Sequence, residues 1–321
     1  MFERMLVPLD GSPLAECVLP HVVAMAGPLG AKVTVLHVCE PKGVDGAIQP
    51  FNGMAWRLKT VEAEAYVEGV AARLREAGLK VESRRLEGRA AEQIVAYAHQ
   101  QDCDLILLSS HGRSGLTGWN VSSVVQKIIA RARVSIMIVR AYQPAAADLR
   151  GRSYSRLMCP LDCSQRAEHV LPVAVALARA HGARVVLTHV VTRPEMPRRR
   201  PYTEEELELI DRIAELNRSE ARQCLEDIRT ALLGEHIDAT SHVVPSGDPA
   251  QSLHDWVKGH EIDLVLMSAH GYTGSTRWPY GSLALNFIVH GSTPLLIAQD
   301  LSAEQIGQTA AEILARESLG H

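Results

Sequence analysis

The chain has 321 residues, about twice the length of an ordinary domain, and its apolar (46%) and charged (22%) fractions are typical of folded globular proteins. A net charge of −4 and an aromatic content of 4% argue against a nucleic-acid partner, which usually needs a basic surface and aromatic stacking platforms. Because no apolar run approaches a membrane span and the N-terminus lacks the pattern of a signal peptide, we expect no membrane association and a cytoplasmic protein whose six cysteines are free thiols.

The first half of the chain alternates apolar strands with helices. Runs of β-branched and other apolar residues predict buried strands, and helical spacing of apolar residues, with proline at a helix start or glycine at a helix end, predicts the helices. In chain order the strands are expected at 4–9, 32–39, 80–86, 104–109 and 134–140, and the helices between them at 13–26, 55–77, 90–99 and 122–132.

The second half repeats this series. The stretch MLVPLDGSPLAECVLP from Met5 matches LMCPLDCSQRAEHVLP from Leu157, and DLILLSSHGRSG from Asp104 matches DLVLMSAHGYTG from Asp263. We therefore infer a tandem duplication. It comprises a first domain at 1–141, a linker at 142–155, a second domain at 156–300 with its last strand at 294–299, and a C-terminal helix within 301–321.

Alternating strands and helices of this kind predict an α/β fold, in which each half is an open five-stranded parallel sheet covered by helices on both faces. Right-handed crossovers favour the strand order 3-2-1-4-5, which reverses between the first and fourth strands. Ligands of such sheets bind at the carboxyl ends of the strands where the order reverses. Asp10 and Asp162 follow the first strands, and glycine-containing loops follow the fourth, so these residues should meet there.

The second half has the pattern G-x2-G-x6-G-S after its fourth strand, from Gly271 to Ser282. Glycines allow backbone amides to approach a ligand closely, and a helix N-terminus with a serine favours phosphate. A carboxylate opposite, at Asp162, suits ribose hydroxyls. The aspartates could instead cap the helices that follow them, the glycines could serve only as turn residues, and the cysteines at 159 and 163 read as inert thiols.

These motifs resemble those of tandem universal stress proteins of the UspA type, over nearly the whole chain. The resemblance implies a Rossmann-like fold and a site for ATP, ADP or AMP, with Mg²⁺ as a candidate companion ion, although some family members lack the loop and bind no ATP. In the second half it implies that adenine contacts Pro160, Leu161 and Val190. The ribose would contact Asp162 and Gly271. The phosphates would contact Gly274, Gly281, Ser282 and Leu283.

The first half matches the same motif at fewer points. The implied binding residues there are Pro8, Leu9, Asp10, Val38, Gly112, Gly115, Ser122 and Ser123. Ser122 stands where the motif has glycine, whereas the second half departs at Cys163, where the first half has Gly11. We therefore expect the second half to be the better nucleotide site.

Three functions remain open. The chain could be a stress-response or regulatory module that binds adenine nucleotide, an interaction module of the same fold without nucleotide, or a slow ATP hydrolase or autophosphorylating protein. No P-loop motif or nucleophile elbow is present, which makes an enzyme the least favoured.

We also expect the last strands of the two halves to face each other as an intramolecular pseudo-dimer, because their apolar edges would otherwise be exposed. A homodimer of chains could then form through other surfaces, such as the C-terminal helix.

Overall fold

Both halves of the chain fold into the same series of elements. The computed structural model describes residues 2–41, 53–113, 121–141, 148–194, 200–272 and 279–301. The predicted C-terminal helix, Gly115 and Gly274 lie outside these ranges. The first half comprises β1 (Arg4–Pro8), the 3-10 helix η1 (Ala15–Val18), α1 (Leu19–Leu29), β2 (Lys32–Cys39), α2 (Gly53–Glu76), β3 (Lys80–Glu87), α3 (Ala90–Gln100), β4 (Leu105–Ser109), α4 (Ser123–Ile129) and β5 (Ser135–Val139).

The second half repeats these elements with one longer helix, α6, which contains most of the extra residues of this half. It comprises β6 (Arg156–Pro160), η2 (Ala167–Val170), α5 (Leu171–His181), β7 (Arg184–Val191), α6 (Glu204–Gly234), β8 (Ala239–Pro245), α7 (Pro249–Gly259), β9 (Leu264–Ser268), α8 (Ser282–His290) and β10 (Leu295–Ala298).

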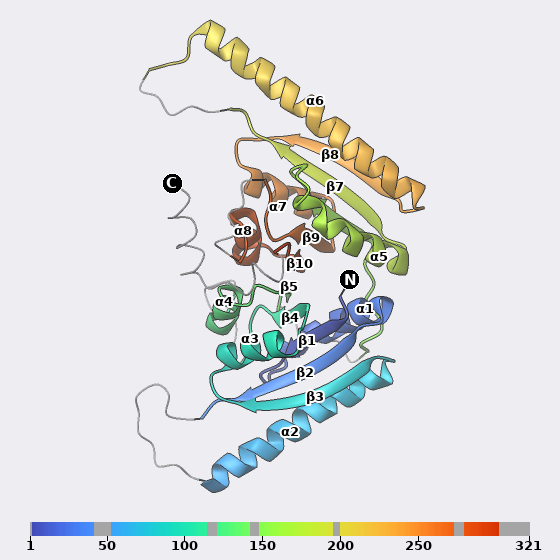
Figure 1. The fold of residues 1–321 in the computed structure, drawn as a ribbon, viewed down its shortest axis with the longest axis vertical. Coiled ribbons are helices and arrows are strands. Elements are labelled where there is room, and N and C mark those ends of the chain that lie inside the picture. Colours follow the sequence, from blue (N-terminus) through green and yellow to red (C-terminus); the bar gives the residue numbers. More distant parts are fainter. Residues whose placement is uncertain are drawn as a thin grey trace.

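All ten strands form one sheet, in the order β3-β2-β1-β4-β5-β10-β9-β6-β7-β8 (Figure 1). Each half keeps the predicted order 3-2-1-4-5 with parallel strands. The last strands of the two halves face each other as expected, because β5 and β10 pair antiparallel and place Leu295 opposite Ile138 and Ile297 opposite Ile136, which joins the two five-stranded sheets into one. The strands of the two halves therefore run in opposite directions, and their carboxyl ends lie at opposite edges of the sheet.

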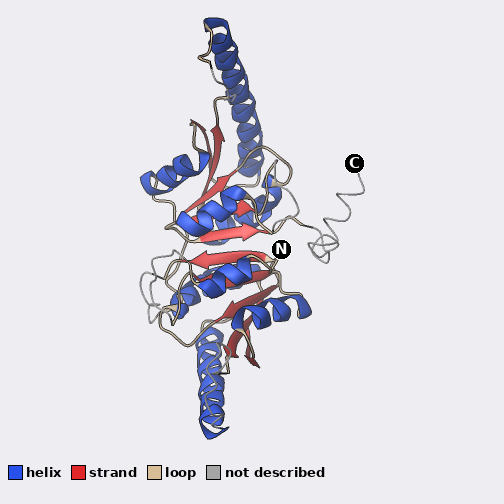
Figure 2. Ribbon diagram, turned by 90° about the vertical axis from the view of Figure 1, so that its left-hand side faces the viewer, coloured by secondary structure: helices blue, strands red, loops and turns tan. Residues whose placement is uncertain are grey.

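Helices cover both faces of this sheet (Figure 2). Side chains alternate along each strand, so Met5 and Val7 enter one core while Leu6 enters the other. The first core includes residues of α1, α2, α5 and α6, and the second includes residues of α3, α4, α7 and α8. Burial on both faces explains why the central strands read as continuous apolar runs.

Two buried polar contacts reinforce the seam between the halves. Arg140 follows β5 and donates from Nη2 to the carbonyls of Phe287 and Ile288 at 2.7 and 3.0 Å, near the carboxyl end of α8. The hydroxyl of Tyr280 donates to the carbonyl of Val134 at 2.6 Å. Both side chains are buried, so these hydrogen bonds join the two halves away from solvent.

The predicted linker contains a core residue. Tyr154 is fully buried between α1 and α5, and its hydroxyl lies 2.8 Å from Nδ1 of His21. Its ring packs edge-on against His181, whose Nε2 lies 2.9 Å from the carbonyl of Ala24. Burial, with a smaller contribution from Arg152, lowers the pKa of His21 to about 3, so this imidazole is neutral at physiological pH. The linker thus helps to dock one half on the other.

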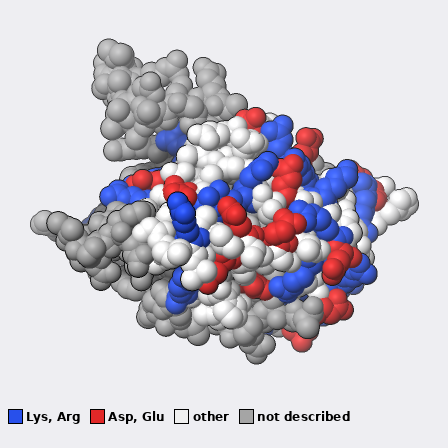
Figure 3. Space-filling view, turned by 90° about the horizontal axis from the view of Figure 1, so that it is seen from below, with Lys and Arg blue, Asp and Glu red and all other residues white. Residues whose placement is uncertain are grey.

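Surface charges alternate in sign on the face that carries α2 and β3. Figure 3 shows positive and negative side chains interleaved there, in agreement with ion pairs such as Arg75–Glu68 and Arg85–Glu64. In the part of the chain that the structure describes, no helix combines the length and apolarity needed to cross a bilayer.

Replacing Tyr280 by Phe tests the seam between the halves. The variant keeps the ring but leaves the buried Val134 carbonyl without its hydroxyl donor, so we expect the free energy of unfolding to fall by about 1–3 kcal/mol in chemical denaturation. Tyr272→Phe is the matched control, because Tyr272 is 83% exposed and should change stability by less than about 0.5 kcal/mol. Equal stability of Tyr280→Phe and the unchanged protein would show that this contact does not hold the seam.

Candidate functional site

The strand order reverses between β6 and β9, and the loops after these two strands meet at Asp162. Its Oδ1 accepts hydrogen bonds from the backbone and hydroxyl of Ser164, at 3.0 and 2.6 Å, and its Oδ2 accepts one from the backbone of Tyr272 at 2.6 Å. Asp162 is exposed at this reversal point. Its carboxylate therefore ties the two loops together and still presents an oxygen toward solvent.

Hydrogen bonds keep this carboxylate ionised. Burial alone would raise the pKa of Asp162, but the hydrogen bonds from Ser164 and Tyr272 together lower it by a larger amount, so the net shift is downward. The alternative that Asp162 caps the next helix is not what the structure shows. The backbone N–H of Ala167, at the beginning of η2, donates instead to the hydroxyl of Ser164 at 3.1 Å.

The first half has the same arrangement around Asp10. Its Oδ1 accepts from the backbone of Ser12 at 2.9 Å and its Oδ2 accepts from the backbone of Arg113 at 2.5 Å. A Cβ at Gly112 would lie 2.0 Å from Oδ2 of Asp10, and one at Gly271 would lie 2.2 Å from Oδ2 of Asp162. Close approach of the carboxylate, rather than an unusual φ angle, therefore requires glycine at both positions.

A crevice of about 330 Å³ opens at the reversal point of the first half. All the binding residues expected in this half that the structure describes line it: Pro8, Leu9, Asp10, Val38, Gly112, Ser122 and Ser123. Its volume is within the range of small-molecule sites.

Two cationic side chains line this crevice that the sequence motifs did not predict as binding residues. Lys59 of α2 and Arg113 after β4 both line it, and Nζ of Lys59 donates to the carbonyl of Glu40 at 2.8 Å. Arg113 lies inside the HGRSG motif and could have been noticed there, but Lys59 comes from a helix that is distant in sequence. Both charges suit an anionic ligand.

In the second half the corresponding elements surround Asp162. Pro160 ends β6, Val190 lies on β7, Gly271 follows β9, and Ser282 and Leu283 begin α8. The backbone of Gly281 donates to the carbonyl of Ala269 at 2.7 Å, which holds the start of α8 against the end of β9. The predicted residues therefore lie on loops that contact one another.

The two helix starts near these reversal points differ. The hydroxyl of Ser122 accepts from the backbone of Val125 at 3.4 Å and so caps α4, which is only seven residues long. Among the described residues, no side chain caps α8, and Ser282 is exposed at its first turn. Uncapped backbone N–H groups are the feature that binds anions at helix N-termini.

A buried histidine–aspartate pair follows β9 and β10 in the second half. Nδ1 of His270 is 2.7 Å from Oδ1 of Asp300, and Nε of Arg166 donates to the other carboxylate oxygen at 2.5 Å. Burial alone would raise the pKa of Asp300, but the hydrogen bonds from His270 and Arg166 together lower it by a larger amount, so the net shift is downward. Ala141 occupies the position of Asp300 in the first half, so this pair belongs to the second half alone.

The expectation of six free thiols is wrong. Cys163, which follows Asp162, forms a disulfide with Cys224 of α6 across a sequence separation of 61 residues. The other four cysteines are free and buried. The spacing of the two bonded residues matches no metal or redox motif, so no signal in the sequence pointed to this pair.

A larger and more open hollow, of about 590 Å³, lies between α6, β8 and α7. Arg222, Glu226, His242 and Trp256 are among the residues that line it. It is remote from the point where the strand order reverses and contains none of the glycine loops. The two reversal points, where an aspartate meets a glycine loop, are therefore the better candidates for a nucleotide.

A model of the universal stress protein family matches residues 1–140 and 153–299, which is most of the chain in two copies. The chain belongs to the universal stress protein family. The predicted resemblance is thus confirmed, and so is the predicted Rossmann-like α/β fold.

Single-domain universal stress proteins match about half of the chain. One from Methanocaldococcus jannaschii is 26% identical over 155 residues, which cover 44% of this chain and 96% of the relative. One from Thermus aquaticus is 30% identical over 146 residues and is matched along its whole length. The crystal structure of a universal stress protein from Archaeoglobus fulgidus covers 92% of this chain with a TM-score of 0.63 and 18% identity, which supports the two-domain fold.

The Asp300 carboxylate predicts an acid-dependent loss of stability in this universal stress protein. Its folded pKa is below the ordinary value of 3.8, so its contribution is complete above that value and is lost as the pH falls through the folded pKa. Asp300→Asn should therefore lower the free energy of unfolding by about 1.5–3 kcal/mol at pH 7 and by clearly less near pH 3. Chemical denaturation at both pH values checks this.

Asp227→Asn, at an exposed position of α6, is the matched control and should show no such pH dependence. A penalty for Asp300→Asn that is the same at pH 7 and pH 3 would contradict this role for the carboxylate.

Proposed function

We propose that this universal stress protein is a regulatory module that binds an adenine nucleotide at its reversal crevices, with ATP or ADP in the second half. The observation that carries the proposal is the combination of the uncapped start of α8 with the ionised Asp162 across the crevice. These two features match the opposite ends of a nucleotide, because a helix N-terminus favours phosphate and a carboxylate accepts ribose hydroxyls.

Three parts of the second crevice receive the ligand in this proposal. The adenine lies against the apolar residues at the ends of β6 and β7, namely Pro160, Leu161 and Val190. The ribose hydroxyls donate to Asp162, which has accepted three hydrogen bonds and retains capacity for another. The phosphates lie at Gly281, Ser282 and Leu283, where α8 begins.

The first crevice is a second candidate for the same ligand class. It keeps Asp10 and the close glycine, and it adds the positive charges of Lys59 and Arg113. Its short helix α4 already has a serine cap, which leaves fewer N–H groups for phosphate. Charge therefore favours the first crevice and the helix start favours the second, so the two halves should differ in affinity.

One observation favours an interaction module as a second candidate function. Both long helices show exposed apolar side chains at i, i+4 and i+7, a spacing that aligns them on one helix face. They are Met54, Leu58 and Val61 on α2 and Leu209, Ile213 and Leu216 on α6. Figure 1 shows these helices at opposite ends of the molecule. The nucleotide experiment below distinguishes the two functions.

Paired glycine variants test nucleotide binding half by half. In Gly271→Ala the new Cβ must displace the Asp162 carboxylate, so we expect the second site to lose ATP affinity by at least about tenfold in isothermal titration. Gly112→Ala imposes the same clash with Asp10 and is the matched control, which should leave the second site intact.

Thermal unfolding of both variants checks that the fold is retained. Equal loss of ATP affinity in the two variants would contradict the assignment to the second half. Absence of ATP and ADP binding by the unchanged protein would overturn the proposed function and favour the interaction module.

A further inference from the structure

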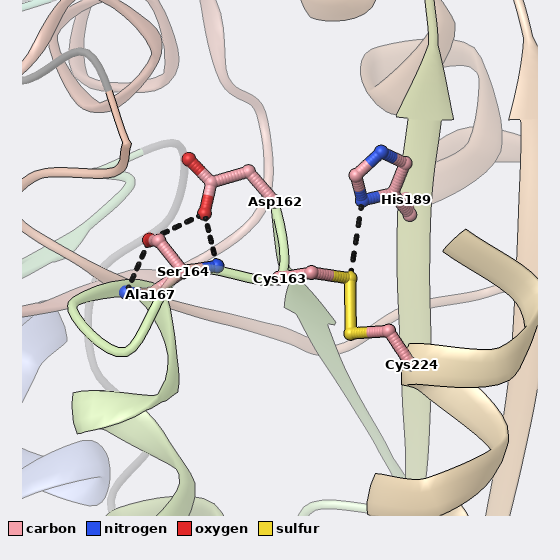
Figure 4. Close-up of a disulfide and its surroundings, with 6 residues drawn as sticks. All are labelled: Asp162, Cys163, Ser164, Ala167, His189 and Cys224. Carbon is pink, nitrogen blue, oxygen red and sulfur yellow. Dashed lines mark hydrogen bonds between the residues drawn. A yellow bond between two sulfur atoms is a disulfide. The ribbon is translucent and has the colours of Figure 1, made fainter. Parts of the chain in front are cut away.

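The disulfide between Cys163 and Cys224 lies beside the carboxylate of the second crevice. Figure 4 shows Cys163 between Asp162 and Ser164, with its sulfur directed toward β7 and α6. The Sγ atom of Cys163 is bonded to Cys224 and lies 3.8 Å from Nδ1 of His189. A covalent link therefore connects α6 to Cys163, the residue that directly follows Asp162.

This pair is set apart from the other cysteines by its access to solvent. Cys163 and Cys224 are half-buried, whereas the four free cysteines are buried. Burial raises the pKa of Cys159 to about 12, and burial with the nearby Asp104 raises that of Cys103 to about 11. A reagent in solution therefore meets one half-buried pair and four buried thiols.

The first half has no cysteine at the two positions that correspond to Cys163 and Cys224. The buried residues of α2 and α6 match at one constant offset, which aligns Val67 with Leu225 and Leu74 with Leu232. The same offset aligns Tyr66 with Cys224, and Gly11 aligns with Cys163. Tyr66 packs edge-on against His37, the counterpart of His189, so both halves fill this space but only the second bridges it.

We propose that Cys163 and Cys224 are a reversible thiol–disulfide modification site, and that its oxidation state controls the loop that carries Asp162. The reaction partner is a dithiol in one direction and a small-molecule disulfide in the other. The effect on nucleotide affinity rests on the proposed function, whereas the chemistry of the pair and the change in the loop do not.

Reduction proceeds by two exchange steps. A thiolate of the dithiol attacks the sulfur of Cys224 and forms a mixed disulfide there. Cys163 leaves as a thiolate beside His189, and this thiolate then takes up a proton. The second thiol of the reagent attacks the mixed disulfide, releases Cys224 as a thiolate that is also protonated, and leaves the reagent as a cyclic disulfide. Two electrons and two protons pass to the protein, and the reverse steps restore the link.

Backbone conformation couples the link to the crevice. Cys163 has a φ of +61°, in the left-handed region, and Gly11 has the corresponding φ of +81°. Glycine adopts this conformation readily, but a residue with a side chain is strained and holds it only when its surroundings require it. With the disulfide broken, Cys163 is released from α6, and the contacts of Asp162 with Ser164 and Tyr272 loosen.

The first experiment measures the chemistry of the pair on the full-length protein. The protein is equilibrated with mixtures of dithiothreitol and its cyclic disulfide, alkylated with N-ethylmaleimide without denaturation, and weighed by mass spectrometry. We expect a single reversible transition of two alkylated cysteines at positions 163 and 224. No disulfide at any mixture, or alkylation that spreads over the buried cysteines, would overturn the proposal.

The second experiment measures the loop by amide hydrogen exchange of the peptide that contains Tyr272, without nucleotide. Reduction should accelerate exchange of this amide roughly tenfold, because releasing one strained residue changes an equilibrium by about that factor. Cys224→Ser should exchange at the faster rate in both redox states. Cys163→Gly restores the residue of the first half and should stay at the slower rate in both states.

The amide of Arg113, which donates to Asp10 in the first half, is the internal control and should not respond. Exchange at Tyr272 that is independent of redox state would overturn the coupling. Titration of ATP into the oxidised and reduced protein completes the test, with a roughly tenfold lower affinity of the second site expected after reduction. If ATP binds in neither state while exchange still responds, the proposed function fails and the modification site stands.

Discussion

The contact on which the site depends is the carboxylate that crosses the point where the strand order reverses. In each half an aspartate after the first strand accepts the backbone N–H that follows the glycine after the fourth strand. The order 3-2-1-4-5 brings these two strand ends together, and the missing Cβ of glycine lets the carboxylate reach across. A carboxyl oxygen is thereby held at each reversal point, close to the beginning of a helix.

The seam between the halves determines how the two crevices relate to each other. Pairing of β5 with β10 covers the edge that each of these strands would otherwise expose, so these two edges need no second molecule. Because the pairing is antiparallel, the carboxyl ends of the two sets of strands face opposite edges of the sheet. The two reversal points therefore lie apart, and they differ in their surroundings, with Lys59 near one and the His270–Asp300 pair near the other.

The strand order, the reversal points and the glycine loops could be predicted from the sequence, because buried parallel strands and chain reversals leave local patterns. The predicted strand at 32–39 coincides with β2, and the other predicted elements differ from the observed ones mainly at their ends. Repetition made these patterns stronger, since each motif occurs twice.

Contacts between distant parts of the chain could not be predicted in the same way. The Cys163–Cys224 link depends on where α6 lies relative to the loop after β6, and the His270–Asp300 pair depends on β9 and β10 being neighbours. Tyr154 looked like part of a polar linker because its burial arises from the docking of α1 and α5. The residues near the site could be recognised from the sequence, but the partners that they contact are determined by three-dimensional packing.

A crystal structure of the full-length protein grown with ATP tests the central claim most directly. Electron density is expected at the second reversal point, with the ribose within hydrogen-bonding distance of Asp162 and the phosphates at the start of α8. Density confined to the hollow between α6, β8 and α7, or empty crevices at saturating ATP, would contradict it.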